Sequence, residues 1–144
     1  MYLDDLNTTM EFDVPAAHIT RERMLDFAKL YDPFPLHHDD EFAKNTRFGQ
    51  LVAPGVMSFM SIWANFIRLN VLGDELIAGK STKIEWMKPV YADDTLNSIC
   101  TVSNLTKRNA KNGLVELTFK VLNQKEELVL TNVTEMIVKC KPTG

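Results

Sequence analysis

The sequence contains little cysteine and no excess of positive charge. Two of its 144 residues are cysteines, and 16 basic residues face 19 acidic ones, for a formal net charge of −3. Cys100 and Cys140 lie far apart in the chain and lack the spacing of metal ligands. The sequence therefore excludes a disulfide framework, and we expect two buried free thiols in a reducing compartment.

Features of nucleic-acid-binding, secreted and membrane-spanning proteins are also missing. A net charge of −3 disfavours the basic face that nucleic-acid binding normally requires. The chain opens with the acidic stretch 1–5 rather than with a basic segment and an apolar run, so no cleavable signal is predicted. Its most apolar stretch, residues 56–72, is interrupted by two serines, two asparagines and an arginine, which argues against a membrane span. We expect a cytoplasmic protein that binds neither nucleic acid nor membranes.

The residues that are present indicate one globular domain over residues 1–144. Hydrophobic residues make up 45% of the chain and charged residues 24%, and no repeat, low-complexity tract or linker divides it. The predicted order is a strand, a short helix, an irregular overhang, a long helix and four further strands. The expected ranges are 9–14 for the first strand, 21–30 and 56–72 for the helices, and 81–88, 95–102, 115–121 and 128–138 for the later strands.

Both predicted helices have recognisable ends. Thr20 can cap the short helix, and Glu22 lies in its first turn, where the helix dipole favours an anion. Gly73 is expected to cap the long helix at its C-terminus. That helix is apolar over most of its circumference, so it should be enclosed on nearly all sides. Its polar residues form one narrow stripe of Ser58, Ser61, Asn65 and Arg68.

After the long helix the hydrophobic pattern changes to a period of two, which is typical of strands. Polar turns at 107–113 and 123–127 separate the later strands, so consecutive strands should be antiparallel neighbours. The sequence thus predicts an α+β fold in which a five-stranded antiparallel sheet wraps around one long central helix.

The most informative stretch runs from Asp32 to His37 and holds an acid and an imidazole five positions apart. Pro33 and Pro35 restrict the backbone between them, so the short helix should stop here and the chain through His37 should form a rigid, non-helical overhang. A carboxylate and a histidine on such a frame can hold one water between them, as general acid–base chemistry requires. The alternative is a turn with a capping aspartate and a surface histidine.

Several motifs follow this stretch in a characteristic order. They are Asp-x-x-Pro-x-His at 32–37, Phe-Ala at 42–43, Thr-Arg-Phe-Gly at 46–49, Leu-Val-Ala-x-Gly at 51–55, Met-Lys-Pro-Val at 87–90 and Asp-Thr-Leu at 94–96. In this order the sequence resembles the MaoC-like acyl dehydratases, which include the (R)-specific enoyl-CoA hydratases. The resemblance runs from about residue 19 to residue 138. It implies a single hot-dog domain, in agreement with the predicted sheet and central helix.

The resemblance also implies an activity, the reversible hydration of a trans-2-enoyl thioester by a water that Asp32 and His37 hold. The thioester carbonyl must be polarised so that an enolate can form. Residues 53–55 lead into the long helix, where free backbone N–H groups and the positive end of the dipole lie. Because Gly55 has no side chain, a ligand can approach closely, and its N–H is the candidate oxyanion donor.

Two positions depart from the family pattern. Phe34 stands where hydratases usually carry Asn or Gln, and Pro54 stands where many carry His. Both are candidate substrate-binding residues, and Phe34 indicates either a changed acyl pocket or a loss of hydratase activity with ligand binding retained. Ser58 is either a small residue tolerated on a buried helix face or a further substrate contact.

Three functions remain open. The first is hydration of an acyl-CoA or acyl-carrier thioester, the second is a hot-dog thioesterase that uses a carboxylate to activate water, and the third is a non-catalytic acyl-CoA-binding subunit. No metal or cofactor is expected beyond the coenzyme A of the substrate. Since one such domain leaves a sheet edge uncovered, we expect a homodimer or a dimer-based oligomer with acyl sites between subunits.

Overall fold

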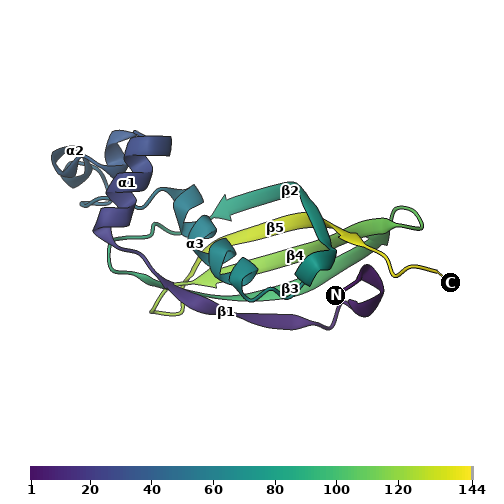
Figure 1. Ribbon diagram of the computed structural model, residues 1–144. Helices are drawn as coiled ribbons and strands as arrows, with labels where there is room; N and C mark the ends of the chain where they lie inside the picture. The colour runs from purple at the N-terminus through teal and green to yellow at the C-terminus, as the bar shows by residue number, and fades with distance from the viewer. Residues whose placement is uncertain (144) are drawn as a thin grey trace.

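The computed structural model describes residues 1–143. A five-stranded antiparallel sheet in the order β1-β3-β4-β5-β2 forms its main layer (Figure 1). The strands are β1 (Glu11–His18), β2 (Leu76–Trp86), β3 (Thr95–Lys107), β4 (Asn112–Leu122) and β5 (Leu128–Lys139). Strands β3, β4 and β5 are consecutive because short turns join them, so β1 and β2 become the two edges.

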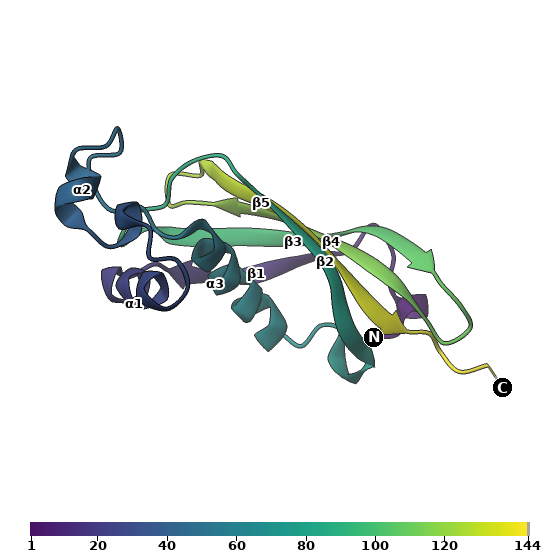
Figure 2. The same cartoon turned by 90° about the horizontal axis from the view of Figure 1, so that it is seen from above.

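Three helices accompany the sheet: α1 (Arg21–Tyr31), α2 (Asp40–Lys44) and α3 (Gly55–Arg68). Helix α3 lies along one face of the sheet, and α1 and α2 gather at one end of the molecule, away from both termini (Figures 1 and 2). Short 3-10 turns occur at Leu3–Asp5, Pro35–His37 and Gly73–Glu75. None of the helices in residues 1–143 combines the length and the apolar character that a membrane span requires.

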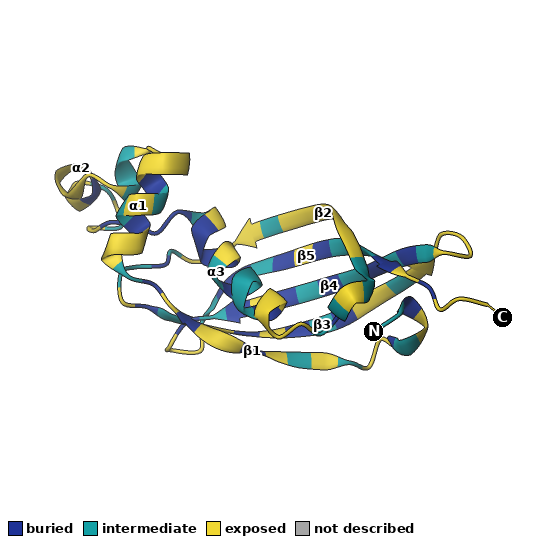
Figure 3. Cartoon of the chain, viewed as in Figure 1, coloured by how far each residue is buried: buried dark blue, intermediate teal, exposed yellow. Residues whose placement is uncertain are grey.

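The core lies between α3 and the inner face of the sheet. Cys100, Phe119 and Asn132 are side by side on β3, β4 and β5, and all three are fully buried. Phe66 of α3 packs edge-to-face on Phe119, with ring centroids 5.3 Å apart. Figure 3 shows buried bands along β4 and β5 and an exposed β2. The predicted α+β fold, with an antiparallel sheet around a central helix, is confirmed.

Both cysteines are free and buried, as the sequence predicts. Burial raises the pKa of the Cys100 thiol to about 12, because the apolar surroundings disfavour the thiolate. Cys100 is therefore a small core residue rather than a nucleophile.

Helix α3 is shorter than the sequence indicates. It ends at Arg68 instead of Leu72, and Asn70 adopts a left-handed conformation with φ 53° that stops the helix. Gly73 is thus not its cap but the first residue of the following 3-10 turn. Asparagine tolerates left-handed φ better than most residues, so it can replace glycine at a helix end.

The predicted enclosure of α3 on nearly all sides is wrong for this chain alone. Val56, Met60 and Ile67 are 44%, 46% and 40% exposed. They follow one another at helical spacing and form, with the partly buried Trp63, an apolar stripe on α3. The sheet wraps the opposite side of the helix and leaves this stripe uncovered.

Strand β1 continues to His18, beyond the predicted end at Val14. Its register against β3 shifts between Val14 and Ala17, around Pro15, which cannot donate a ladder hydrogen bond. The side-chain amide of Asn65 donates to the carbonyls of Pro15 and Ala16, at 2.9 and 3.2 Å. The polar stripe of α3 thus stabilises the irregular part of this edge strand.

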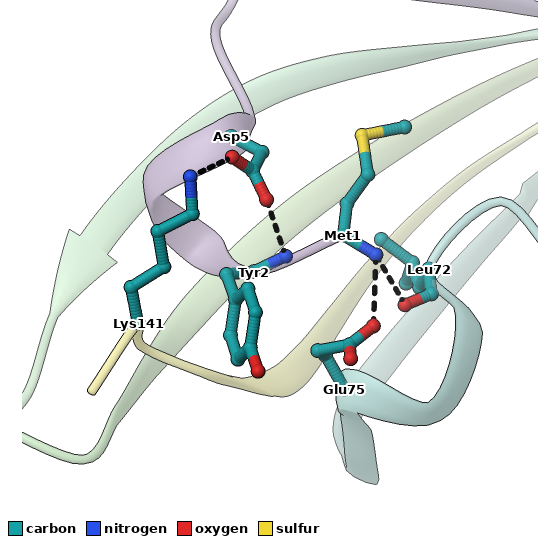
Figure 4. A network of polar contacts seen from close by, with 6 residues as sticks. All are labelled: Met1, Tyr2, Asp5, Leu72, Glu75 and Lys141. Atoms are coloured by element: carbon teal, nitrogen blue, oxygen red, sulfur yellow. Dashed lines mark hydrogen bonds and ion pairs between the residues drawn. The ribbon is translucent and has the colours of Figure 1, made fainter.

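Polar contacts also connect the first residues of the chain to the segment before β2 and to the segment after β5 (Figure 4). The amino group of Met1 donates to the Leu72 carbonyl at 2.9 Å and to the Glu75 carboxylate at 3.0 Å. Lys141 pairs with Asp5 at 2.6 Å. These hydrogen bonds hold the pKa of each carboxyl, Glu75 and Asp5, below its ordinary value.

Candidate active site

Asp32 directly follows α1, and its N–H donates to the Ala28 carbonyl at 3.0 Å. The predicted N-cap at the other end of α1 is confirmed, because the Thr20 side chain accepts from the Arg23 N–H. The overhang is not wholly irregular, however. Residues 35–37 form a 3-10 turn, since the fixed φ of Pro35 suits the first position of a helical turn. Helix α2, capped by Asp39, was also not predicted.

The turn brings His37 back to Asp32. The Nε2 atom of His37 lies 3.3 Å from Oδ2 of Asp32, and the Nδ1 atom lies 2.7 Å from the Val52 carbonyl oxygen. A carbonyl oxygen can only accept a hydrogen bond, so Nδ1 must carry a proton. Nε2 is therefore the nitrogen that can exchange a proton, and it faces the carboxylate.

Backbone hydrogen bonds of Val52 and Ala53 connect this pair to the start of α3. The Val52 N–H donates to the Leu36 carbonyl at 3.2 Å, while its carbonyl accepts from His37. The next residue, Ala53, donates to the Val90 carbonyl at 2.7 Å. Hydrogen bonds to the main chain thus join the overhang, the start of α3 and the segment after β2. They fix the dyad, the pair of Asp32 and His37, relative to the helix.

Helix α3 begins at Gly55, with Pro54 as its N-cap. The first hydrogen bond of the helix runs from the Ser58 N–H to the Pro54 carbonyl at 3.2 Å, so the N–H groups of residues 55–57 have no acceptor within the helix. The Trp86 indole occupies the place where a side chain at Gly55 would begin. The absence of a side chain at Gly55 lets Trp86, the last residue of β2, pack on its Cα.

One cavity of about 420 Å³ contains most of the predicted site residues. Its walls include Asp32, His37, Gly55 and Ser58. Ser58 is 1% exposed, and within residues 1–143 its hydroxyl has no hydrogen-bond partner. An unpaired buried hydroxyl is unfavourable unless a ligand or water completes it. The cavity therefore combines an acid–base pair, free helix N–H groups and an unsatisfied hydroxyl.

Phe34 and Pro54 are not on the wall of this cavity in the described structure. Phe34 is 52% exposed, and its ring lies edge-on to the rings of His37 and Phe42, at 5.7 and 6.2 Å between centroids. Pro54 is buried at the start of α3. A direct contact of either residue with the substrate remains a prediction, and the structure adds a contact between Phe34 and the imidazole of His37.

Other wall residues were not predicted as site residues: Arg47, Phe48, Val52, Ala53, Val56, Trp86, Met87, Lys88, Pro89 and Val90. They come mainly from two motifs, Thr-Arg-Phe-Gly and Met-Lys-Pro-Val, which contributed to the family resemblance. The positions of these motifs in the order of the chain are the signal that could have identified them.

Two contacts outside the cavity hold the overhang in place. Arg21 at the start of α1 forms a two-armed ion pair with Asp40 at the start of α2, which lowers the pKa of that carboxyl. In the overhang, His38 donates from Nε2 to the Pro33 carbonyl at 2.8 Å. This bond closes the turn between Asp32 and His37.

Comparison with known proteins gives the class of the chain. Residues 6–125 match the family described as the MaoC like domain. This match covers most of the sequence, and the protein belongs to that family.

Among curated proteins, an uncharacterized protein of Bacillus subtilis, YdeM, is 27% identical over 140 residues, which cover 96% of this chain and 99% of that protein. A mesaconyl-CoA hydratase of Cereibacter sphaeroides is 29% identical over 143 residues, or 96% of this chain, but only 40% of that longer protein.

Solved structures of similar fold include a monoamine oxidase regulatory protein from Archaeoglobus fulgidus, with a TM-score of 0.93, 27% identity and coverage of 99% of this chain and 96% of that chain. A MaoC-like dehydratase from Rhodospirillum rubrum has a TM-score of 0.84 and 28% sequence identity, with 99% of both chains covered. An (R)-hydratase from A. caviae has a TM-score of 0.74 and 22% sequence identity, and the match covers 95% of this chain and 98% of that chain. The hot-dog fold is therefore confirmed.

Proposed function

We propose that the protein is a hydro-lyase that reversibly hydrates a trans-2-enoyl thioester, and that coenzyme A is its carrier. The observation that supports this proposal most is that one cavity is lined by Asp32, His37, the free N-terminus of α3 and the unpartnered Ser58 hydroxyl. The family includes hydratases, and the similarity to a mesaconyl-CoA hydratase supports hydration of a CoA thioester. The reaction needs no cofactor.

The reaction sets the number of protons that the dyad must carry. The water oxygen bonds to the β-carbon, the carbon–carbon double bond is lost, and a proton bonds to the α-carbon. One member of the pair accepts a proton from water while the other gives one to carbon, so the pair must start with one transferable proton at the contact between Nε2 of His37 and Oδ2 of Asp32. Exchange of the proton across this contact restores the starting state.

The start of α3 supplies the donors for the enolate oxygen. The N–H of Gly55 has no helical acceptor and carries part of the positive dipole charge. Ser58 lies one helical turn later on the same cavity wall, so its hydroxyl can give a second hydrogen bond to the thioester. In this role Ser58 is a substrate-binding residue rather than a tolerated small side chain.

A panel of short and medium trans-2-enoyl-CoAs tests the proposal. Enoyl absorbance and free thiol are followed together in each reaction. We expect absorbance to fall without thiol release, and the 3-hydroxyacyl product to regain absorbance when it is supplied in excess. Thiol release would identify a thioesterase, and binding without turnover would identify a non-catalytic acyl-CoA-binding subunit. Either result would overturn the proposal.

We also propose that the protein works as a homodimer in the cytoplasm. Strand β2 has a neighbour on one side only, β5, and is almost entirely exposed. It lies beside the apolar stripe of α3, and a second copy can cover both features around a two-fold axis. Fold neighbours at 22% and 16% identity, HadBC and ChsH1-ChsH2 of Mycobacterium tuberculosis, are complexes. The two free cysteines suit a reducing compartment.

A further inference from the structure

Arg47 is a cation on the wall of the catalytic cavity. It follows the first residue of an ordered turn, in which the Thr46 hydroxyl accepts from the Phe48 N–H at 3.2 Å and the Thr46 carbonyl accepts from the Gly49 N–H at 3.1 Å. Gly49 has φ 71°, a conformation that favours glycine. The chain thus presents Arg47 from a defined backbone rather than from a loose loop.

The guanidinium of Arg47 has no acidic partner in residues 1–143. Its carbon lies 4.9 Å from the centroid of the Phe48 ring, which is also on the cavity wall. The other cation on the wall, Lys88, is already paired with Glu127 at 2.5 Å. Arg47 is therefore the wall cation whose charge is still free.

The stacking of Arg47 on Phe48 favours one kind of ligand. The ring covers a face of the guanidinium and limits its rotation, while the N–H groups at its edge stay free. These groups form a planar fork that matches two oxygens of a carboxylate or phosphate. A cation placed in this way is suited to bind an anionic group of the substrate.

We propose that Arg47 binds a carboxylate on the acyl group, so that the preferred substrate is a short enoyl thioester of a dicarboxylic acid. This inference rests on the proposed hydration and names its substrate class. Arg47 is exposed but lines the same cavity of about 420 Å³ as Asp32 and His37, so an anion that it binds lies in the cavity that holds this pair. The phosphates of coenzyme A are separated from the thioester by the whole pantetheine arm, so they lie outside this cavity when the thioester is bound at Asp32 and His37.

Fumaryl and crotonyl thioesters provide a matched pair of substrates, because both have four acyl carbons and differ by a carboxylate in place of a methyl group. Each is supplied as the CoA thioester and as the N-acetylcysteamine thioester, which has no phosphate. The values of kcat/KM are measured for the wild type, Arg47→Gln, Arg47→Lys and Arg23→Gln. The last variant removes a positive charge from α1, away from the cavity wall.

We expect the wild type to prefer the fumaryl thioester by about tenfold or more with either carrier, as for a charge-assisted hydrogen bond. Arg47→Gln should bring the ratio of the two kcat/KM values close to one, Arg47→Lys should retain part of the preference, and Arg23→Gln should retain all of it. An unchanged ratio in Arg47→Gln would overturn the proposal. So would an Arg47 effect that is equal for both acyl groups and present only with CoA, because that pattern indicates phosphate binding.

Binding separates a failure of this inference from a failure of the proposed hydration. If neither enoyl thioester reacts, the affinities for succinyl-CoA and butyryl-CoA are measured by calorimetry with the wild type and Arg47→Gln. A preference for succinyl-CoA that Arg47→Gln abolishes would support the carboxylate site even without turnover. Equal affinities in the wild type would overturn it.

Discussion

Among single residues, Ser58 combines complete burial with a hydroxyl that no group in residues 1–143 satisfies. Such a hydroxyl costs about 1–3 kcal/mol of folding free energy in a protein without ligand. A residue selected for packing alone would avoid that cost, since alanine would fit the same helix position and has a higher helix propensity.

Ser58→Ala separates binding from packing. Its melting temperature should be equal to or above that of the wild type, because an unpaired polar group is removed, while kcat/KM for an enoyl thioester should fall about tenfold, the size expected for one hydrogen bond. Thermal denaturation and initial rates are the two measurements. A destabilised variant with full activity would show that Ser58 belongs to the core only.

Phe34→Asn tests the departure from the family pattern. The ring of Phe34 touches His37 but is off the cavity wall, so its loss should lower kcat more than it changes the preference among acyl chains. Because the ring is half-exposed, the variant should melt within a few degrees of the wild type. A shift in acyl preference at unchanged kcat would instead support the original expectation that Phe34 contacts the acyl chain.

The predicted site residues that the structure brings to one cavity share a local signal. Asp32 and His37 are close in the chain and held by prolines, and Gly55 and Ser58 lie in the first turn of one helix. Arg47 and Trp86 reach the same cavity only because the sheet and overhang close around it. Contacts between residues that are far apart in the chain cannot be predicted from a local pattern, because such a pattern does not show which side chains line the same cavity.

At the level of secondary structure, the site depends on the packing of β2 against the start of α3. Gly55→Ala would place a methyl group against the Trp86 indole. The indole is exposed and can move, so we expect a small loss of stability together with a change in tryptophan emission and lower activity. The emission change should be absent when Gly55→Ala is made in a Trp86→Phe background. An unchanged spectrum in the wild-type background would contradict this packing.

The boundaries of the elements were predicted less well than their existence. Hydrophobic periodicity identified α3, but its end depends on Asn70, whose left-handed conformation is available to few residues other than glycine. The predicted first strand ends at Val14, yet β1 continues past Pro15, where the side chain of Asn65 of α3 donates to the carbonyls around the irregularity. The end of α3 thus depends on the conformation of one residue, and the end of β1 depends on a tertiary contact. The local hydrophobic pattern predicts neither.

For the whole molecule, the uncovered β2 edge and the apolar stripe of α3 predict self-association. Sedimentation at micromolar concentration should show a dimer, and Met60→Lys should shift it toward monomer because a charge would be buried in the apolar contact. Ile99→Lys is the matched control, since Ile99 is also 46% exposed but faces away from α3 on β3. A monomeric wild type, or equal dissociation in both variants, would contradict the proposed dimer.

The central claim, that Asp32 and His37 together catalyse hydration in this cavity, is tested most directly by the rate of crotonyl-CoA hydration in Asp32→Asn. This change keeps the shape of the side chain and removes the carboxylate that faces Nε2 of His37. We predict a fall in kcat of about 10²–10⁴-fold, the usual effect of losing a general acid–base group. The folded fraction, measured by circular dichroism, should be unchanged. A folded Asp32→Asn variant that hydrates crotonyl-CoA at nearly the wild-type rate would contradict the claim.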